Sequence, residues 1–409
     1  MSTTAEKLQK IIDIKNDLKE KINAKGGSIT DTTPFAEYPI QVENISSGGG
    51  SGDTTEKHKV TYFDVDGTVL KTDYVEDGGT TTPPSDPNYD SEYLQFDCWN
   101  YDVANLVVDR DINIGAIYKT ITGDSYFFIK LTENIGLEVP TLKITGATSI
   151  DWGDGTVDTK LTHTYADYGE YVIKVSGMTS INSYLFNSQS SVYNYSLQKC
   201  YLGNTVTSLG NNAFYNCYSL TNTTIPEGVT SIPDYAFNYC YGLTSIVIPE
   251  SVTSIGNSAF YGCYSLTTIV IPEGVTSIGT NAFNSCYSLT SIVIPESVTS
   301  IGINAFNSCR SLTSIVIPEG VTSIGNEAFA TCHSLKNYVF NCSIVPTLSN
   351  TNAFGSNNKS AYIWVRDELV DSYKSATNWS TYASYIKPLS SMSDKLREEL
   401  GLWYKENII

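Results

Sequence analysis

The stretch LTSIVIPESVTSIGNSAFYGC, residues 243–263, decides the fold because near-copies of it recur at a step of 23 residues. The copies share a valine that opens a VTSIG-like segment, at Val206, Val229, Val252, Val275, Val298 and Val321. They also share a phenylalanine, at Phe214, Phe237, Phe260, Phe283, Phe306 and Phe329. Self-similarity at one fixed period indicates a stack of structural repeats.

The apolar positions of one copy indicate how it folds. Leu243, Ile246 and Ile248 are spaced as in the strand of a leucine-rich repeat, and Val252 with Ile255 predicts a second short extended piece. One copy cannot bury these side chains alone, whereas coils stacked about 4.8 Å apart bury them in one continuous core. A proline ends the first strand of each copy, where its missing N–H disrupts the ladder least; these are Pro226, Pro249, Pro272, Pro295 and Pro318.

Six of the nine cysteines occupy one repeat position: Cys217, Cys240, Cys263, Cys286, Cys309 and Cys332. Two interpretations are open for them, a disulfide framework or a buried ladder of free thiols. Equivalent cysteines on adjacent coils would all compete for one another. The start of the chain, MSTTAEKLQK, also has neither a basic nor an apolar region of a secretion signal. Both observations favour free thiols.

Residues 179–345 closely resemble the BspA-type leucine-rich repeat, through its TSIGxxAFxxCxSLTSIxIP signature. An upstream copy contains Leu197, Leu202 and Val206, with an irregular segment ahead of it at 187–196. The tail at 365–390 resembles the end-piece that follows such arrays. We therefore expect a solenoid at 178–345, then a cap and terminal helix at 346–409.

Residues 141–175 contain W-G-D-G-T and H-T-Y-x-x-x-G-x-Y-x-V elements between alternating strands. These elements are similar to a polycystic-kidney-disease-type immunoglobulin-like domain, which the resemblance places at 124–177. Asp151, Asp154 and Asp158 could form a calcium loop, but carboxylates around a glycine turn are more often plain turn chemistry. We expect no metal here.

The stretch VTYFDVDGTVLKTDYV, residues 60–75, resembles the first motif of haloacid-dehalogenase-type phosphatases, with Asp64 as nucleophile and Asp66 as acid/base. Such an enzyme needs a parallel α/β sheet, yet a polar, turn-rich segment follows and no crossover helix pattern appears before residue 120. Alternating residues around an Asp-Gly turn predict a β-hairpin instead. We expect a small β module at 58–123 and no enzymatic activity.

The amino terminus shows a helix pattern that ends at Gly26 and Gly27, with a stripe of apolar residues at Leu8, Ile11, Leu18 and Ile22. The stripe predicts either a weak coiled coil, most plausibly trimeric, or a helix that docks within the chain. With the P-F-A-E-Y-P segment after it, the region 1–46 resembles the attachment region of bacteriophage tail and fibre proteins. A Gly-rich flexible linker follows at 47–57.

Composition limits the function classes. The chain has 409 residues and a net charge of −18, which repels nucleic acid. No apolar run reaches about 18 residues, so we expect no membrane insertion. The three histidines lie far apart without a Ser or Cys partner. We expect no catalytic residues and no cofactor.

Together these patterns predict a multidomain, mainly β protein with an N-terminal helix, a small β module, an immunoglobulin-like β-sandwich and a capped leucine-rich repeat solenoid. The predicted function is a virion appendage of a bacteriophage tail, baseplate or head. Its N-terminus would bind other virion proteins and its solenoid a host-surface glycan or protein. The alternatives are a bacterial cell-surface leucine-rich repeat adhesin, and a purely structural spacer.

Two rows of the solenoid are candidate receptor-binding faces. The first follows the cysteines and contains Tyr218, Tyr241, Tyr264, Tyr287, Arg310 and His333. Stacked tyrosines offer rigid amphipathic surface for binding, although the same row could simply cover and stiffen the coil edge. The second lies on the strands and contains Val247, Val270, Val293 and Val316, with Ser245, Thr268, Ser291 and Ser314.

Overall fold

The computed structural model describes residues 57–399 except for 88, 101–102, 105, 109–110, 135, 140, 187–195 and 356–360. By its internal contacts the chain divides into Met1–Thr55 and Glu56–Ile409, and the described residues all belong to the second unit. The attachment stripe Leu8, Ile11, Leu18 and Ile22 lies outside them, as do the helix at 1–46 and the linker at 47–57 apart from Lys57. The structure therefore does not test these predictions.

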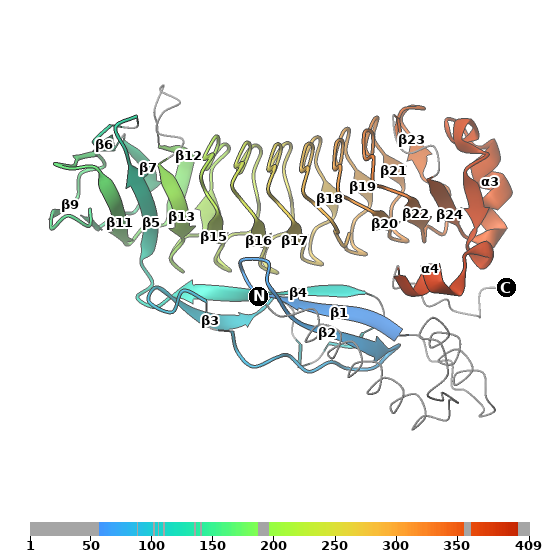
Figure 1. The fold of residues 1–409 in the computed structure, drawn as a ribbon, viewed down its shortest axis with the longest axis horizontal. Helices are drawn as coiled ribbons and strands as arrows, with labels where there is room; N and C mark the ends of the chain where they lie inside the picture. Colours follow the sequence, from blue (N-terminus) through green and yellow to red (C-terminus); the bar gives the residue numbers. More distant parts are fainter. Residues whose placement is uncertain are drawn as a thin grey trace, which may run out of the picture. The chain divides into compact units, whose positions relative to one another are not determined.

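The repeats form a solenoid of 23-residue coils, as predicted (Figure 1). The first row of strands is β13 (Leu197–Tyr201), β15 (Asn222–Thr224), β16 (Ser245–Val247), β17 (Thr268–Val270), β20 (Ser314–Ile317), β22 (Asn337–Phe340) and β24 (Tyr362–Val365). The second row is β14 (Ser208–Leu209), β18 (Ser277–Ile278), β19 (Ser300–Ile301), β21 (Ser323–Ile324) and β23 (Thr347–Leu348). Neighbouring coils in the middle of the solenoid pair in parallel at a step of 23 residues, for example Ser245 with Thr268 and Ser277 with Ser300. The step is 24 or 25 residues at the carboxyl-terminal end, where Ser323 pairs with Thr347 and Asn337 with Tyr362.

The predicted phenylalanines stack in the core of the solenoid. All six have no exposed surface, and successive rings from Phe214 to Phe329 lie 5.0, 5.3, 5.4, 5.4 and 5.5 Å apart with planes within 10° of parallel. Phe354 continues the stack 5.8 Å beyond Phe329. The core therefore runs unbroken through the coils, and the predicted register is confirmed.

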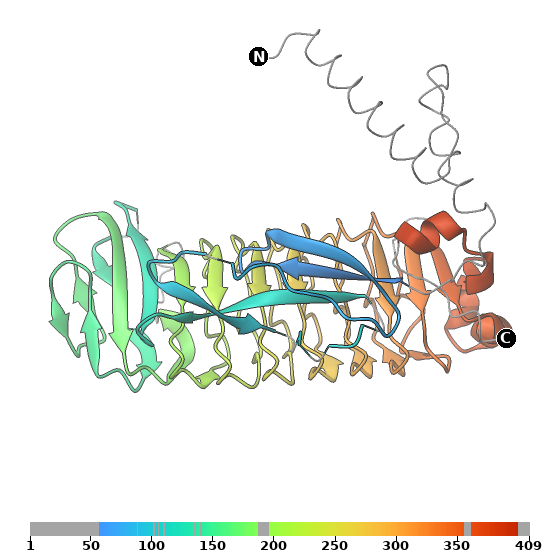
Figure 2. The same cartoon turned by 90° about the horizontal axis from the view of Figure 1, so that it is seen from below.

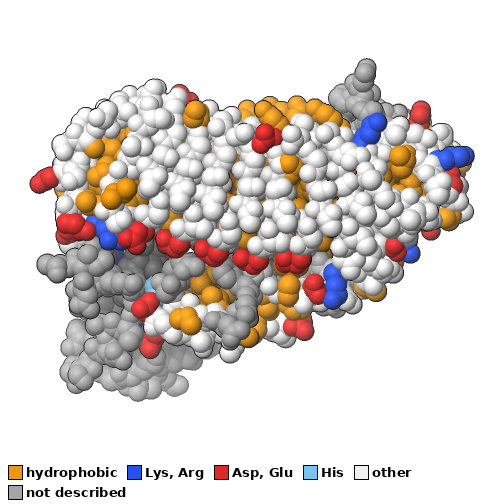
Figure 3. All heavy atoms as spheres, turned by 180° about the vertical axis from the view of Figure 1, so that it is seen from behind, with side chains coloured by type: hydrophobic (Ala, Val, Ile, Leu, Met, Phe, Trp, Pro, Cys, Tyr) orange, Lys and Arg blue, Asp and Glu red, His pale blue; other side chains and the backbone are white. Residues whose placement is uncertain are grey.

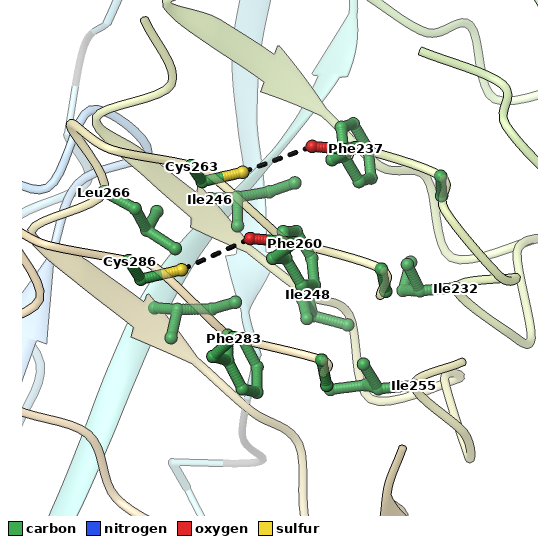
Figure 4. Close-up of a cluster of buried hydrophobic side chains, with 14 of the residues drawn as sticks. Ile232, Phe237, Ile246, Ile248, Ile255, Phe260, Cys263, Leu266, Phe283 and Cys286 are labelled. Carbon is green, nitrogen blue, oxygen red and sulfur yellow. Dashed lines mark hydrogen bonds between the residues drawn. The ribbon is translucent and has the colours of Figure 1, made fainter. Parts of the chain in front are cut away.

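The predicted cysteine ladder is also buried beside the phenylalanines. Each thiol from Cys240 to Cys332 donates to the carbonyl oxygen of the phenylalanine 26 residues earlier, over 3.1–3.3 Å; Figure 4 shows the bonds from Cys263 and Cys286. Burial raises the pKa of Cys217 to about 12. Cysteine suits this position because it is small and apolar yet can donate to the coil before it. All nine cysteines are free thiols in the structure.

Residues 125–186 extend the solenoid at its amino-terminal end. The strands are β5 (Ser125–Leu131), β6 (Glu138–Val139), β7 (Leu142–Thr145), β8 (Ser149–Asp151), β9 (Val157–Asp158), β10 (His163–Thr164), β11 (Gly169–Ser176) and β12 (Ser180–Phe186). Strand β5 pairs antiparallel with β13, and β12 pairs with β14 of the first coils. The paired strands cover the open edge of the first coil, which would otherwise expose unpaired backbone groups.

The hydrophobic core is likewise continuous from Phe127 into the solenoid. A separate immunoglobulin-like module at 124–177 is therefore not confirmed: its strands β5, β8, β9 and β11 share one sheet, ordered β15-β13-β5-β11-β8-β9, with the repeats, and β7 joins a second sheet with β12 and β14.

A carboxyl-terminal cap closes the other end of the solenoid. It contains the 3₁₀ turns η3 (Asp367–Leu369), η4 (Trp379–Tyr382) and η5 (Leu389–Ser391), the helices α3 (Val370–Ser375) and α4 (Asp394–Glu399), and strand β25 (Ile386–Pro388). Tyr373 and Trp379 are fully buried against Phe340. The indole N–H of Trp379 donates to the Pro346 carbonyl oxygen over 2.7 Å.

The small β module is a four-stranded sheet, ordered β2-β1-β4-β3, that lies along the solenoid (Figures 1 and 2). Its strands are β1 (Lys57–Phe63), β2 (Val69–Glu76), β3 (Leu94–Trp99) and β4 (Ile112–Thr120). Strands β1 and β2 form the predicted antiparallel hairpin. The Asp64 carboxylate at its turn accepts hydrogen bonds from the Tyr118 hydroxyl and the Val65 N–H, each over 2.7 Å. In this hairpin Asp64 holds the turn against β4.

Candidate functional site

The strand row of the solenoid, the second candidate face, is covered in two coils by the β module. Ser245, Val247, Thr268 and Val270 are each 8% exposed or less. The tip of the β1–β2 hairpin packs against this face. There the Ser245 hydroxyl donates a hydrogen bond to the Val65 carbonyl oxygen over 2.7 Å. The prediction that these four residues face a receptor is therefore wrong, because the chain's own β module covers them.

Two glycines make this close docking possible. A Cβ at Gly67 would lie 3.0 Å from the Ser245 Cβ, and a Cβ at Gly115 would lie 2.5 Å from a methyl carbon of Val247. Gly67 also has φ +87°, a conformation that L side chains rarely adopt. The D-V-D-G-T motif, which resembles a phosphatase signature, thus forms the tip by which the module contacts the repeats.

The far end of the same strand face is covered by the carboxyl-terminal cap. Leu389 and Met392 form a buried cluster with Val339 and Trp364, and Val316 packs against it. Val293, between the two covers, is half-buried, and Ser291 is exposed. Most of the strand row is therefore internal surface of this protein.

The tyrosine row, the first candidate face, forms a regular ladder. The rings of Tyr218, Tyr241, Tyr264 and Tyr287 follow one another at 4.7, 4.6 and 4.8 Å, with interplanar angles of 8°, 9° and 14°. Each of the four is half-buried. Burial, together with the neighbouring ring of Tyr264, raises the pKa of Tyr241 to about 12, so its hydroxyl stays protonated. The ladder presents ring edges and uncharged hydroxyl groups to solvent.

A second group of tyrosines, which the sequence analysis missed, supports the first ladder. Tyr239 lies edge-on to Tyr215, Tyr241 and Tyr261, at 6.2, 5.8 and 5.2 Å. Tyr215, Tyr239 and Tyr261 stand one or two residues before the cysteine of their coil, and asparagine, serine, alanine or threonine takes their place in the later coils. The variation at these two positions, within an otherwise constant repeat, was the sequence feature that could have revealed this group of tyrosines.

The ladder ends on a cation. Arg310 occupies the position of a fifth tyrosine and is exposed, and its guanidinium carbon lies 4.5 Å from the ring centroid of Tyr287. His333, one coil further, is exposed as well. The structure therefore brings five of the six predicted residues into one continuous stack, with His333 in the following coil.

A row of glutamates runs along another edge of the coils, directly after the prolines: Glu227, Glu250, Glu273, Glu296 and Glu319. Figure 3 shows a line of acidic side chains along one side of the molecule. The Glu296 carboxylate accepts the backbone N–H of Glu319 over 3.2 Å, so the row also links neighbouring coils. Burial, and after it the carboxylates of Glu273 and Glu227, raises the pKa of Glu250 to about 7.

The free energy of unfolding should therefore rise as the pH falls from above 7 to about 4.5, the ordinary pKa of glutamate. Folded Glu250 takes up a proton near pH 7 and the unfolded chain does so only near its ordinary value, so protons favour the folded state in this window. Denaturant titrations across the window should show that Glu250→Gln loses this contribution, while Glu133→Gln, at an exposed position, keeps it. An unchanged pH dependence in Glu250→Gln would contradict the assignment.

The carboxylates considered for calcium bond within their own turns. Asp151 accepts the Gly153 N–H over 2.9 Å, Asp154 contacts His163 over 2.7 Å, and Asp158 accepts the indole N–H of Trp152 over 3.1 Å. In the described part of the chain, no group of three or more His, Cys, Asp or Glu side chains is arranged to hold a metal ion. None of the described helices has the length and apolar character needed to cross a membrane.

Comparison with known proteins identifies the repeats. The family model of the BspA type leucine rich repeat region matches residues 169–244 and 230–361. No curated protein matches the chain. A leucine rich repeat protein of T. pallidum is 24% identical, over 52% of this chain and 91% of its own, with a TM-score of 0.31. One from Bacteroides ovatus is 22% identical over 50% and 69%, with a TM-score of 0.27.

A leucine rich cell surface protein of Faecalibacterium prausnitzii is 23% identical, over 59% of this chain and 88% of its own, with a TM-score of 0.24. The family match and the 23-residue coils agree on the same segment. Residues 169–361 of this chain are a BspA-type leucine-rich repeat region.

Proposed function

We propose that this chain is a surface-displayed adhesive protein whose solenoid binds a receptor through the tyrosine ladder. The observation that carries the proposal is the contrast between the two candidate faces. The strand row is occupied by the β module and the cap, whereas the four stacked tyrosines and Arg310 reach solvent.

The physical properties of the ladder suit recognition. Tyrosine offers a large amphipathic contact area and loses little conformational entropy on binding, because it has only two side-chain torsions. Stacking between rings 4.6–4.8 Å apart has already ordered these side chains before a partner arrives. Ordering before binding improves affinity because less freedom is lost in the complex.

The bacterial cell surface is the first candidate for the location of this protein. The comparison identified a BspA type leucine rich repeat region, so the adhesin alternative now has more support than the virion appendage. The virion hypothesis rests on the resemblance of residues 1–46, with attachment and trimer formation through Leu8, Ile11, Leu18 and Ile22. Antibody labelling of cells and purified particles separates the two: label on the envelope supports the adhesin, and label on particles supports the appendage.

Binding by the ladder is tested with the full-length protein on immobilised glycans, extracellular-matrix proteins and intact bacterial cells. The double variant Tyr241→Ser, Tyr264→Ser should bind its partner about tenfold more weakly or worse, because central tyrosines commonly dominate binding energy. Tyr168→Ser is the matched control, since Tyr168 is 49% exposed and lies outside the repeats. Equal binding by the double variant, or no binding of the unchanged protein to any surface, would refute the proposal.

A further inference from the structure

Arg310 is the one strongly basic group in a long acidic stretch. Between Lys199 and Lys336 the sequence contains no other Lys or Arg, while the whole chain carries a net charge of −18. No ion pair joins Arg310 to any residue in the part of the chain that the structure describes. Its exposed guanidinium therefore keeps its donors available at the end of the tyrosine ladder.

The stacking contact with Tyr287 positions this guanidinium. Its guanidinium carbon lies over the tyrosine ring, 4.5 Å from the centroid, a favourable cation–π distance. A guanidinium carries five N–H donors in a planar fork, which form paired hydrogen bonds to carboxylates. The contact with Tyr287 therefore holds the Arg310 guanidinium in a position to bind one anionic group.

The ladder beside Arg310 limits the kind of partner that can carry this anion. Its ring faces largely cover one another at 4.6–4.8 Å, so a sugar or a side chain cannot lie flat between them. What remains is a row of equally spaced hydroxyl groups, with Ser219, Ser265 and Ser288 directly after three of the tyrosines. These hydroxyl groups are identical hydrogen-bond donors and acceptors in a regular row. Such a row is better suited to a polymer whose own hydroxyl groups repeat than to an irregular protein surface.

We propose that the ladder and Arg310 together bind a linear acidic polysaccharide, with Arg310 pairing a uronic acid carboxylate and the tyrosine hydroxyls bonding the sugar hydroxyls along the chain. This inference rests on the proposed adhesive function and names the partner of the same site. The net charge of −18 repels such a polymer at long range, as it repels nucleic acid, so binding must come from the local contact with Arg310 and the tyrosine hydroxyls.

The probes are polygalacturonate, its fully methyl-esterified form, and poly-L-glutamate, each titrated against the full-length protein by biolayer interferometry. We expect polygalacturonate to bind. The ester should bind at least about tenfold more weakly because it has lost the carboxylate, and hydrogen bonds to charged groups contribute most. Poly-L-glutamate should bind at least about tenfold more weakly because it keeps the carboxylates but lacks the sugar hydroxyl groups. Comparable binding of poly-L-glutamate would overturn the polysaccharide assignment, and comparable binding of the ester would overturn the role of the carboxylate.

Arg310→Tyr is the decisive variant because it places at this position the residue that four other coils already have. It should fold normally and bind polygalacturonate about tenfold more weakly, with Arg310→Lys in between because lysine lacks the paired donors. Lys160→Gln, which removes an exposed charge elsewhere, should bind like the unchanged protein. Unaltered binding by Arg310→Tyr, or no binding of polygalacturonate, overturns the inference. If other surface partners still bind and need Tyr241 and Tyr264, the adhesive function itself stands.

Discussion

Replacing Phe283 with alanine should lower the free energy of unfolding by about 3–5 kcal/mol. The ring has no exposed surface and lies 5.4 Å from both Phe260 and Phe306. Its loss removes buried apolar area, leaves a cavity and interrupts the stack on both sides at once. Because each coil of a solenoid contacts only its neighbours, the defect should weaken two coil interfaces.

Guanidinium titration followed by circular dichroism measures this loss. Ile303→Ala is the control in the next coil, since Ile303 is 45% exposed and should change the unfolding free energy by less than about 0.5 kcal/mol. A Phe283→Ala protein that unfolds like the control would mean that the ring does not lie in the core.

Replacing Gly115 with alanine should destabilise the contact between the β module and the solenoid, by about 1–3 kcal/mol. The new Cβ would meet the Val247 side chain at 2.5 Å, closer than real Cβ contacts. Trimming the opposing residue with Val247→Ala removes those methyl carbons. The double variant should therefore recover part of the loss, with a coupling energy between about 0.5 and 3 kcal/mol.

Hydrogen exchange across β4, together with denaturant titration, follows the docking of the module. Gly169→Ala is the control, because its added Cβ would have only ordinary contacts, at 3.7 Å from Tyr171. If the effects of Gly115→Ala and Val247→Ala simply add, the two residues do not meet and the docked arrangement is wrong.

The repeat period was enough to predict the solenoid, the phenylalanine stack and the cysteine ladder. A residue that recurs every 23 positions must occupy the same place in every coil, so one coil's pattern defines them all. The tyrosine ladder followed from the same rule. The sequence also shows that Arg310 replaces the tyrosine in the next coil. Only the structure shows that Arg310 lies over the ring of Tyr287.

The covered strand face could not be predicted, because it depends on contacts between distant segments. Val65 and Ser245 are separated by 180 residues, and nothing in the local pattern of either segment encodes their pairing. The motifs at 141–175 likewise predicted an immunoglobulin-like domain, since they describe strands and turns but not their neighbours. The pairing of β5 with β13 made that segment part of the solenoid.

Hydroxyl-radical footprinting of the full-length protein, free and bound to the surface partner found in the binding assays, locates the receptor face. The structure leads us to expect strong protection of Tyr241 and Tyr264 on binding, and unchanged oxidation of Tyr168, which lies outside the repeats. Val247 should stay unreactive throughout, because β4 of the β module covers it at Gly115 in both states. Protection elsewhere with Tyr241 and Tyr264 still fully reactive, or Val247 becoming reactive when the partner binds, would contradict a receptor site on the tyrosine ladder.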